Sequence, residues 1–168
     1  MPLFSRRASL PAPIRARLAL PPGDRVLVAT ELSDGGWAAA TRRALYVVDP
    51  TVERRAWADV DRATLDAETS TLTVHWVTGA SQALALTGTG ARPFAQVLRE
   101  RVQSSVVHSE KVTVAGAGTI RVALRRDEDG ELVSQVIGDG TTDLSDPAVA
   151  ALVDAAERRV RAAAGLAG

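Results

Sequence analysis

Cysteine is absent from the 168-residue sequence, which excludes disulfide bonds, thiol nucleophiles and zinc–thiolate sites. A net charge is absent as well, because 20 basic side chains are balanced by 20 acidic ones. Dedicated nucleic-acid-binding proteins usually carry an excess of basic residues. The charge balance therefore disfavours a nucleic-acid partner.

Long hydrophobic runs are also missing. No stretch approaches the roughly 18 consecutive apolar residues that a membrane-spanning helix needs. The first residues do not form a secretory signal either, because Pro11 and Pro13 interrupt the apolar run and Arg15 and Arg17 add charge to it. We therefore expect a cytoplasmic protein.

Lysine occurs once, at Lys111, against 19 arginines, a bias that most simply reflects a GC-rich genome. Residues 1–25 contain five arginines and one aspartate, whereas the remainder contains 15 basic and 19 acidic residues. Residues 1–22 thus form a basic N-terminal arm. We expect a helical turn around residues 14–20 that packs on the body through Ile14, Leu18 and Leu20. The alternative function for the arm is a weak contact with an anionic membrane.

Residues 24–86 show the short apolar runs and period-two alternation that are typical of strands. Seven strands are predicted, at residues 25–32, 37–41, 44–48, 54–57, 60–66, 71–78 and 82–86. A helix is predicted over residues 93–105, with Pro93 at its first position and one apolar stripe formed by Phe94, Val97, Leu98 and Val102. We expect a partly closed antiparallel barrel or sandwich, with this helix plugging one open end.

A second, smaller unit follows. Three antiparallel strands are predicted at residues 111–115, 119–126 and 132–138, with glycine-containing turns between them. A last helix begins at the N-cap Asp146, with Pro147 at the first helical position. Its apolar stripe consists of Val149, Leu152, Val153, Ala156 and Val160. The predicted fold class is α+β, with the three-stranded sheet and its helix packed on the barrel.

The order of four short segments is similar to a known family. Residues 23–27 (GDRVL), 36–37 (GW), 41–48 (TRRALYVV) and 54–61 (RRAWADVD) resemble the bacterial pleckstrin-homology-like (PH-like) domains. The resemblance covers residues 23–105. It implies a PH-like domain at residues 23–106, and residues 107–168 resemble an extension seen in actinobacterial proteins of this kind.

What the resemblance implies is a fold and a tendency to act as a binding or assembly module, since a fold does not by itself supply a function. Phosphoinositide-binding members gather basic residues in the loop between their first two strands. Here that loop, residues 33–36, carries Asp34 and no cation. Binding of a lipid phosphate at that loop is therefore disfavoured.

Trp37, Trp57 and Trp76 are interpreted as packing residues, because aromatic platforms for nucleic acids need interleaved cations. His75 and His108 lie on different elements without further ligands nearby, so we predict neither a metal site nor a catalytic histidine.

Two arginine pairs, Arg42–Arg43 and Arg54–Arg55, are the candidate binding residues. We expect them on adjacent strands, where one arginine of each pair would point outwards and form a small positive patch. Two interpretations stay open. The arginines either form ordinary surface ion pairs with Glu53, Asp59 and Asp61, or they dock an acidic partner protein or an anionic lipid surface.

The resulting hypothesis is a non-enzymatic binding or assembly module that associates with a partner protein or with itself. It includes no catalytic residue, cofactor or metal ion. The alternative is a peripheral protein that binds an anionic membrane or ligand through the basic arm and the arginine pairs. An enzyme is the least favoured class, because no catalytic motif is present.

Overall fold

The computed structural model describes residues 9–116, 118–138 and 140–166, which form an α+β fold with three antiparallel sheets of four, three and three strands. The class predicted from the sequence is therefore confirmed. A short helix, α1 (Ala12–Arg17), comes first. The next elements are β1 (Val26–Glu31), β2 (Trp37–Thr41), β3 (Ala44–Asp49), β4 (Thr51–Ala56), the 3₁₀ turn η1 (Trp57–Asp59), β5 (Val60–Asp66), β6 (Thr71–Trp76), β7 (Ser81–Ala85), the 3₁₀ turn η2 (Gly88–Gly90) and α2 (Ala91–Ser105). The chain ends with β8 (Val106–Val114), β9 (Gly118–Arg126), β10 (Leu132–Ile137) and α3 (Pro147–Ala163).

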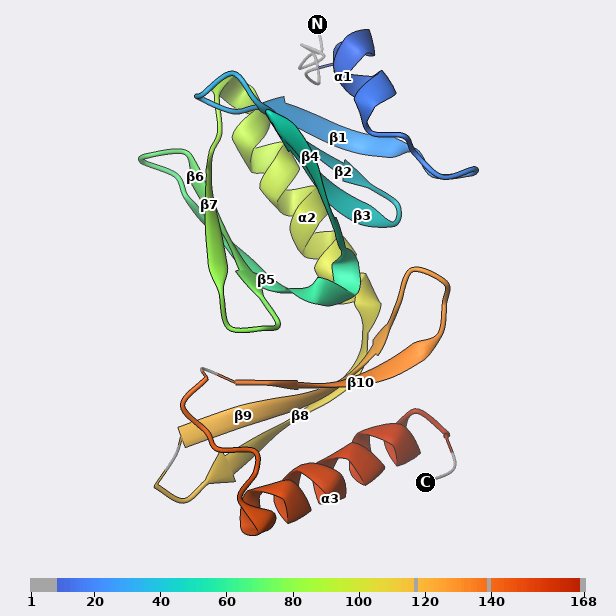
Figure 1. Ribbon diagram of the computed structural model, residues 1–168, viewed down its shortest axis with the longest axis vertical. Helices are drawn as coiled ribbons and strands as arrows, with labels where there is room; N and C mark the ends of the chain where they lie inside the picture. Colours follow the sequence, from blue (N-terminus) through green and yellow to red (C-terminus); the bar gives the residue numbers. More distant parts are fainter. Residues whose placement is uncertain (1–8, 117, 139, 167–168) are drawn as a thin grey trace, which may run out of the picture.

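The first seven strands, predicted to form a partly closed barrel or a sandwich, form two sheets and no closed barrel in the described chain. The strand orders are β1-β2-β3-β4 and β5-β6-β7. The two sheets meet along one edge, where Leu32 and Leu86 form a single β-bridge and the Ser33 N–H donates to the Ala85 carbonyl at 2.9 Å. At the other edge η1 separates β4 from β5, and these two strands are not paired in the described chain. Helix α2 packs across the space between the sheets (Figure 1).

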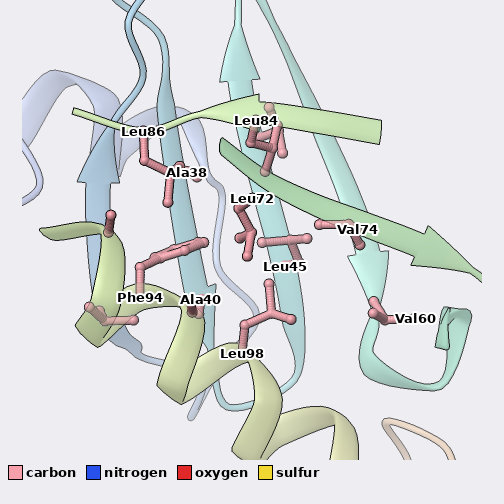
Figure 2. Packing of buried hydrophobic residues seen from close by; sticks show 14 of the residues in the cluster. Ala38, Ala40, Leu45, Val60, Leu72, Val74, Leu84, Leu86, Phe94 and Leu98 are labelled. Carbon is pink, nitrogen blue, oxygen red and sulfur yellow. The ribbon is translucent and has the colours of Figure 1, made fainter. Parts of the chain in front are cut away.

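The main hydrophobic core lies between α2 and the two sheets. Phe94 and Leu98 of α2 are fully buried and point among apolar side chains of both sheets (Figure 2). The alternation of β6 places Leu72 and Val74 in the same core, as the sequence predicted. Burial of a side chain of this size contributes about 1.5–3 kcal/mol, so α2 is the element that holds the two sheets together.

Helix α2 begins two residues earlier than predicted, so that Pro93 occupies its third position instead of its first. The turn η2 leads directly into the helix, and Ala91 is already buried at the helix start. A Cβ atom at Gly90 would lie 2.8 Å from Oγ1 of Thr30. The absence of a side chain at Gly90 therefore allows the helix to start close to β1.

The last unit consists of one sheet, in the order β10-β9-β8, with α3 on one face (Figure 1). The side chains of Ile120, Val122 and Leu124 alternate along β9 and pack with α3. Asp146 caps α3 as predicted, because its Oδ1 accepts a hydrogen bond of 2.7 Å from the Ala148 N–H.

Two details of this unit differ from the sequence prediction. Strand β8 begins at Val106, immediately after α2, and not near residue 111. No glycine or proline separates the helix from the strand, so no sequence signal marks the boundary. Leu152 was assigned to the buried stripe of α3, but it is 43% exposed because it lies beside the contact face and not on it.

The arm packs on the outer face of the four-stranded sheet. Leu18 is buried there in a small cluster around Tyr46, and Ile14 and Leu20 pack against the same cluster, as predicted. Arg6 and Arg7 of the arm lie outside the described residues. Helices α1 and α3 lie at opposite ends of the molecule (Figure 1). In the described part of the chain no helix combines the length and apolar character that crossing a membrane requires.

Candidate functional site

A buried arginine joins the two units of the molecule. Because Ile120, Val122 and Leu124 face α3, the alternate residues of β9 face the first unit. Among them is Arg125, which is only 1% exposed. Its guanidinium donates to the Val60 carbonyl and the Trp57 carbonyl, each at 2.7 Å, and to Oγ of Ser105. Arg125 of β9 therefore binds η1, β5 and the end of α2 together.

The charge of Arg125 has no carboxylate in ion-pair contact within the described residues. Desolvation, together with a smaller effect of the nearby Arg121, lowers the pKa of Arg125 to about 10, and Asp59 opposes the shift. Even so, the guanidinium stays protonated at neutral pH. Its cost of burial is offset by hydrogen bonds to neutral oxygens, which orient the fork of the guanidinium.

A β-bulge supplies the next contact between the units. The pairing of β5 with β6 shifts between Val60 and Arg62, which leaves Asp61 at the irregularity. Bulges commonly redirect a side chain, and here Asp61 is 7% exposed and pairs with Arg121 of β9 as well as with Arg62 at 3.2 Å. The bulge therefore turns an otherwise ordinary strand residue into an acceptor for the second unit.

Two further polar contacts complete the junction. Gln135 of β10 donates to the Ala58 carbonyl at 2.9 Å, while its Oε1 is buried and has no hydrogen-bond partner among the described residues. Arg54 of β4 pairs with Glu128 in the β9–β10 turn. This pairing, together with a hydrogen bond to the Tyr46 hydroxyl, raises the pKa of Arg54. The two units are thus fixed by directed hydrogen bonds across a polar junction.

A small basic cleft lies on one side of this junction, which we name the arginine cleft. Its volume is about 160 Å³. It is lined by four arginines together with other residues from both units: Arg42, Arg43, Trp57, Ala58, Arg101, Ser104, Ser105, Arg126, Asp127 and Glu128. Four cations against two carboxylates leave an excess of two positive charges.

The turn between β2 and β3 positions Arg42 and Arg43. Oγ1 of Thr41 accepts from the backbone N–H groups of Arg43 and Ala44, at 3.2 and 3.0 Å. Asp24 accepts from the hydroxyl of Thr41 at 2.8 Å and from the Arg42 N–H at 3.1 Å. The turn is therefore held by side-chain hydrogen bonds, and its two arginines are presented from an ordered backbone.

Of the four predicted arginines, two reach this cleft. Arg42 and Arg43 lie in a turn, not on a strand as expected. Arg54 and Arg55 lie on β4 and face opposite sides, since Arg54 contacts the Tyr46 ring and Arg55 lies 5.4 Å from the centroid of the Trp76 ring. Arg54 pairs with Glu128, which lines the arginine cleft, whereas Arg55 does not line it.

The expected ion pairs are found only in part. Arg55 pairs with Glu53 at 3.5 Å, as predicted. The partner of Arg54 is Glu128, and that of Asp61 is in the second unit. The sequence reasoning missed Arg101 and Arg126 as cleft residues. The only signal for Arg101 was its position away from the apolar stripe of α2.

The three tryptophans differ in burial. Trp57 is 6% exposed and donates from Nε1 to the Thr41 carbonyl at 3.1 Å, so its predicted packing role is confirmed. Trp37 and Trp76 are only partly buried. Trp57 lines the arginine cleft, whereas Trp76 lies elsewhere on the junction.

A second, wider cleft lies at the junction, with a volume of about 410 Å³, and we name it the wide cleft. Both units contribute to it, and its lining combines apolar and basic groups: Asp61, Arg62, His75, Trp76, Gly79, Lys111, Thr119, Ile120, Arg121, Ile137 and Gly138. The β6–β7 turn approaches the second unit here, because a Cβ atom at Gly79 would lie 3.9 Å from the Gly138 carbonyl oxygen.

The other end of the two-sheet unit is acidic. Asp34, in the β1–β2 turn, lies beside Asp49 at the end of β3. A hydrogen bond with Asp34 and the repulsion of its charge raise the pKa of the Asp49 carboxyl. The described residues that line the pocket at this end include no cation, although Arg17 of the arm donates to the adjacent Pro50 carbonyl.

Among the described residues, no group of three or more histidine, aspartate or glutamate side chains is arranged to hold a metal ion. His75 borders the wide cleft, and His108 is exposed on β8. Comparisons of the chain with protein-family models, with curated proteins and with solved structures found no match in any of the three.

Proposed function

We propose that the protein is a non-enzymatic binding module, PH-like in residues 23–106, that accepts acidic side chains of a partner protein in the arginine cleft. The order of four strands, three strands and one helix supports the PH-like assignment. The C-terminal unit adds Arg126 and the β9–β10 turn to the cleft. Both units therefore take part in the proposed binding.

Three unpaired arginines carry this proposal. In the described structure, the guanidinium groups of Arg42, Arg43 and Arg101 form no hydrogen bond and no ion pair. A guanidinium presents a planar fork of donors that matches a carboxylate or phosphate. It also keeps its proton at neutral pH, so these groups are suited to binding an anion and not to transferring protons.

The carboxylates of the cleft form no ion pair with these arginines in the described structure. Glu128 pairs with Arg54. Oδ1 of Asp127 accepts from the backbone N–H groups of Asp129 and Glu131, at 3.0 and 2.9 Å. The excess positive charge is thus available to an external anion.

The volume of the arginine cleft limits the size of the anionic group that it can hold. A volume of about 160 Å³ is below the roughly 300–1,000 Å³ typical of small-molecule sites. A side-chain carboxylate or phosphoryl group fits such a space, whereas a nucleotide or another whole cofactor exceeds it. We therefore favour an acidic segment of a partner protein.

The test is a titration of the full chain into a fluorescently labelled glutamate-rich peptide, followed by fluorescence anisotropy. We expect Arg101→Ala to weaken binding about tenfold or more, as the loss of a charged hydrogen bond predicts. Arg99→Ala is the matched control, because it removes the same charge from an exposed position of the same helix outside the cleft. Equal losses in both variants would show general charge attraction and overturn the proposal.

Vesicles with and without anionic lipid test the alternative, a peripheral membrane protein. Arg54 and Arg55 have partners within the protein, and Arg17 of the arm donates to the Pro50 carbonyl. These contacts favour the protein partner over the membrane. Sedimentation with anionic vesicles that Arg101→Ala leaves unchanged, combined with no peptide binding, would replace our proposal by the alternative.

A further inference from the structure

The wide cleft has the dimensions and the lining of a small-molecule binding site. Its volume of about 410 Å³ falls within the range of roughly 300–1,000 Å³ that small-molecule sites occupy. Such sites combine apolar surface with a few polar groups that orient the ligand. The wide cleft has both, and it shares no residue with the arginine cleft.

The net positive charge of the wide cleft favours an anionic ligand. Arg62, Lys111 and Arg121 face it together with one carboxylate, Asp61. That carboxylate is already shared by Arg62 and Arg121. Three cations against one carboxylate leave two positive charges in excess, before any charge on His75.

Lys111 is the free cation of this set. Its side chain forms no hydrogen bond and no ion pair in the described parts of the chain, and it is exposed on β8. It is also the only lysine in the sequence. An ammonium group acts as a mobile point charge, which suits a single carboxylate or phosphate at the mouth of a cleft.

The apolar part of the lining favours a ligand that contains an aromatic ring. Ile137 contributes aliphatic surface, and Trp76 contributes a partly exposed indole. Arg55 lies against this ring at 5.4 Å from its centroid, which fixes the indole from one side. A fixed, partly exposed indole provides a surface on which an aromatic ring can stack.

We propose that the wide cleft binds a small aromatic anion, a planar ring that carries one carboxylate or phosphate group. The ring packs on Trp76 and Ile137, and the anionic group binds Lys111 and Arg121. Because the cleft is formed by both units, the ligand also bridges them. This site is separate from the arginine cleft, so the inference does not rest on the proposed function.

Indole N–H signals of the full-length ¹⁵N-labelled protein test the inference, because each tryptophan reports on a different place. Trp76 lines the wide cleft, Trp57 lines the arginine cleft, and Trp37 lines neither. The probes are 2-naphthoate, adenosine monophosphate, uncharged 2-naphthalenemethanol and inorganic phosphate. We expect saturable shifts of the Trp76 signal with naphthoate or with the nucleotide.

Lys111→Ala is expected to weaken this binding about tenfold, and Lys111→Arg to restore most of it. Arg158→Ala is the matched control, since Arg158 is exposed on α3 and does not line the cleft. The inference is overturned if the Trp76 signal does not move with either aromatic anion, if 2-naphthalenemethanol shifts it equally, or if inorganic phosphate alone does so. A glutamate peptide that shifts only the Trp57 signal would support the proposed function without bearing on this site.

Discussion

Each of the two units of this protein is stabilised internally by one kind of interaction. A different kind of interaction joins the two units to each other. The first unit encloses its core between two sheets and α2. The second unit covers one face of a single sheet with α3, and the other face carries Arg121, Arg125 and Gln135. Apolar burial therefore stabilises each unit, whereas hydrogen bonds from buried polar side chains fix their relative position.

This difference matters for binding because both clefts lie at the junction. Apolar contacts are non-directional, whereas the fork of Arg125 accepts only a narrow geometry with the carbonyl groups of Trp57 and Val60. The polar junction thus holds cationic side chains from two separate cores at defined positions. A looser, purely apolar junction would leave the shape of both clefts less defined.

Removal of the central aromatic residue of the first core tests whether apolar burial stabilises the first unit. Phe94→Ala is expected to lower the free energy of unfolding by about 3–5 kcal/mol, because Phe94 is fully buried and the cavity cannot collapse. Urea unfolding measures this loss. Val97→Ala, at a partly buried position of the same helix, should cost clearly less. Similar losses for both variants would contradict the assignment of Phe94 to the centre of the core.

Removal of the buried arginine tests the junction. Arg125→Met keeps much of the side-chain volume but leaves the Trp57 and Val60 carbonyls and Oγ of Ser105 without this donor. A buried acceptor left unpaired costs about 1–3 kcal/mol, whereas the Trp57 carbonyl keeps the backbone N–H of Val60 as a donor. Part of this cost is offset because a desolvated charge is removed as well. We expect a net loss of about 3 kcal/mol in urea unfolding.

Hydrogen exchange distinguishes opening of the junction from unfolding of the two cores. Hydrogen exchange in Arg125→Met should accelerate at η1 and the start of β5 while the centre of α2 remains protected, because the two units separate before either core unfolds. Arg126→Met is the control, since this neighbour is exposed on the same strand. Uniform acceleration over the whole chain would mean that the junction is not a distinct element of stability.

Much of the fold could be predicted because the apolar spacing along the sequence is local information. The alternation of Leu72 and Val74, the stripe of α2 and the cap at Asp146 are each visible within a few residues. The boundary at Val106 was missed because a helix passes into a strand there without a turn residue. The division of seven strands into two sheets depends on which edges pair, and local spacing does not reveal this.

The sites were predicted less well, for a related reason. Arg42 and Arg43 were identified as a pair, but Arg101 and Arg126 join them only through tertiary packing. Arg125 is the clearest case, since alternation on β9 places it opposite the apolar face of its own sheet. From the sequence alone that position looks solvent-facing, and only the docking of the first unit makes it buried.

Removal of an exposed ion pair should change the stability of the protein least. It therefore contrasts with removal of the buried Arg125. Arg159 of α3 donates to both carboxylate oxygens of Glu110 on β8, with Nε at 2.9 Å from Oε2. The hydrogen bond from Arg159 holds the pKa of Glu110 below its ordinary value.

A carboxyl whose pKa is lowered by folding stabilises the protein above its unfolded pKa, and this contribution is lost as the pH falls through the folded pKa. Glu110→Gln should therefore lower Tm slightly at about pH 7, and the difference from the parent protein should shrink as the pH falls toward about pH 3. Glu157→Gln, which removes a charge from α3 without breaking an ion pair in the described structure, is the control. A difference that is undiminished at about pH 3 would mean that Glu110 stabilises the second unit by packing and not by charge, and a loss as large as that of Arg125→Met would remove the distinction between surface and buried arginines.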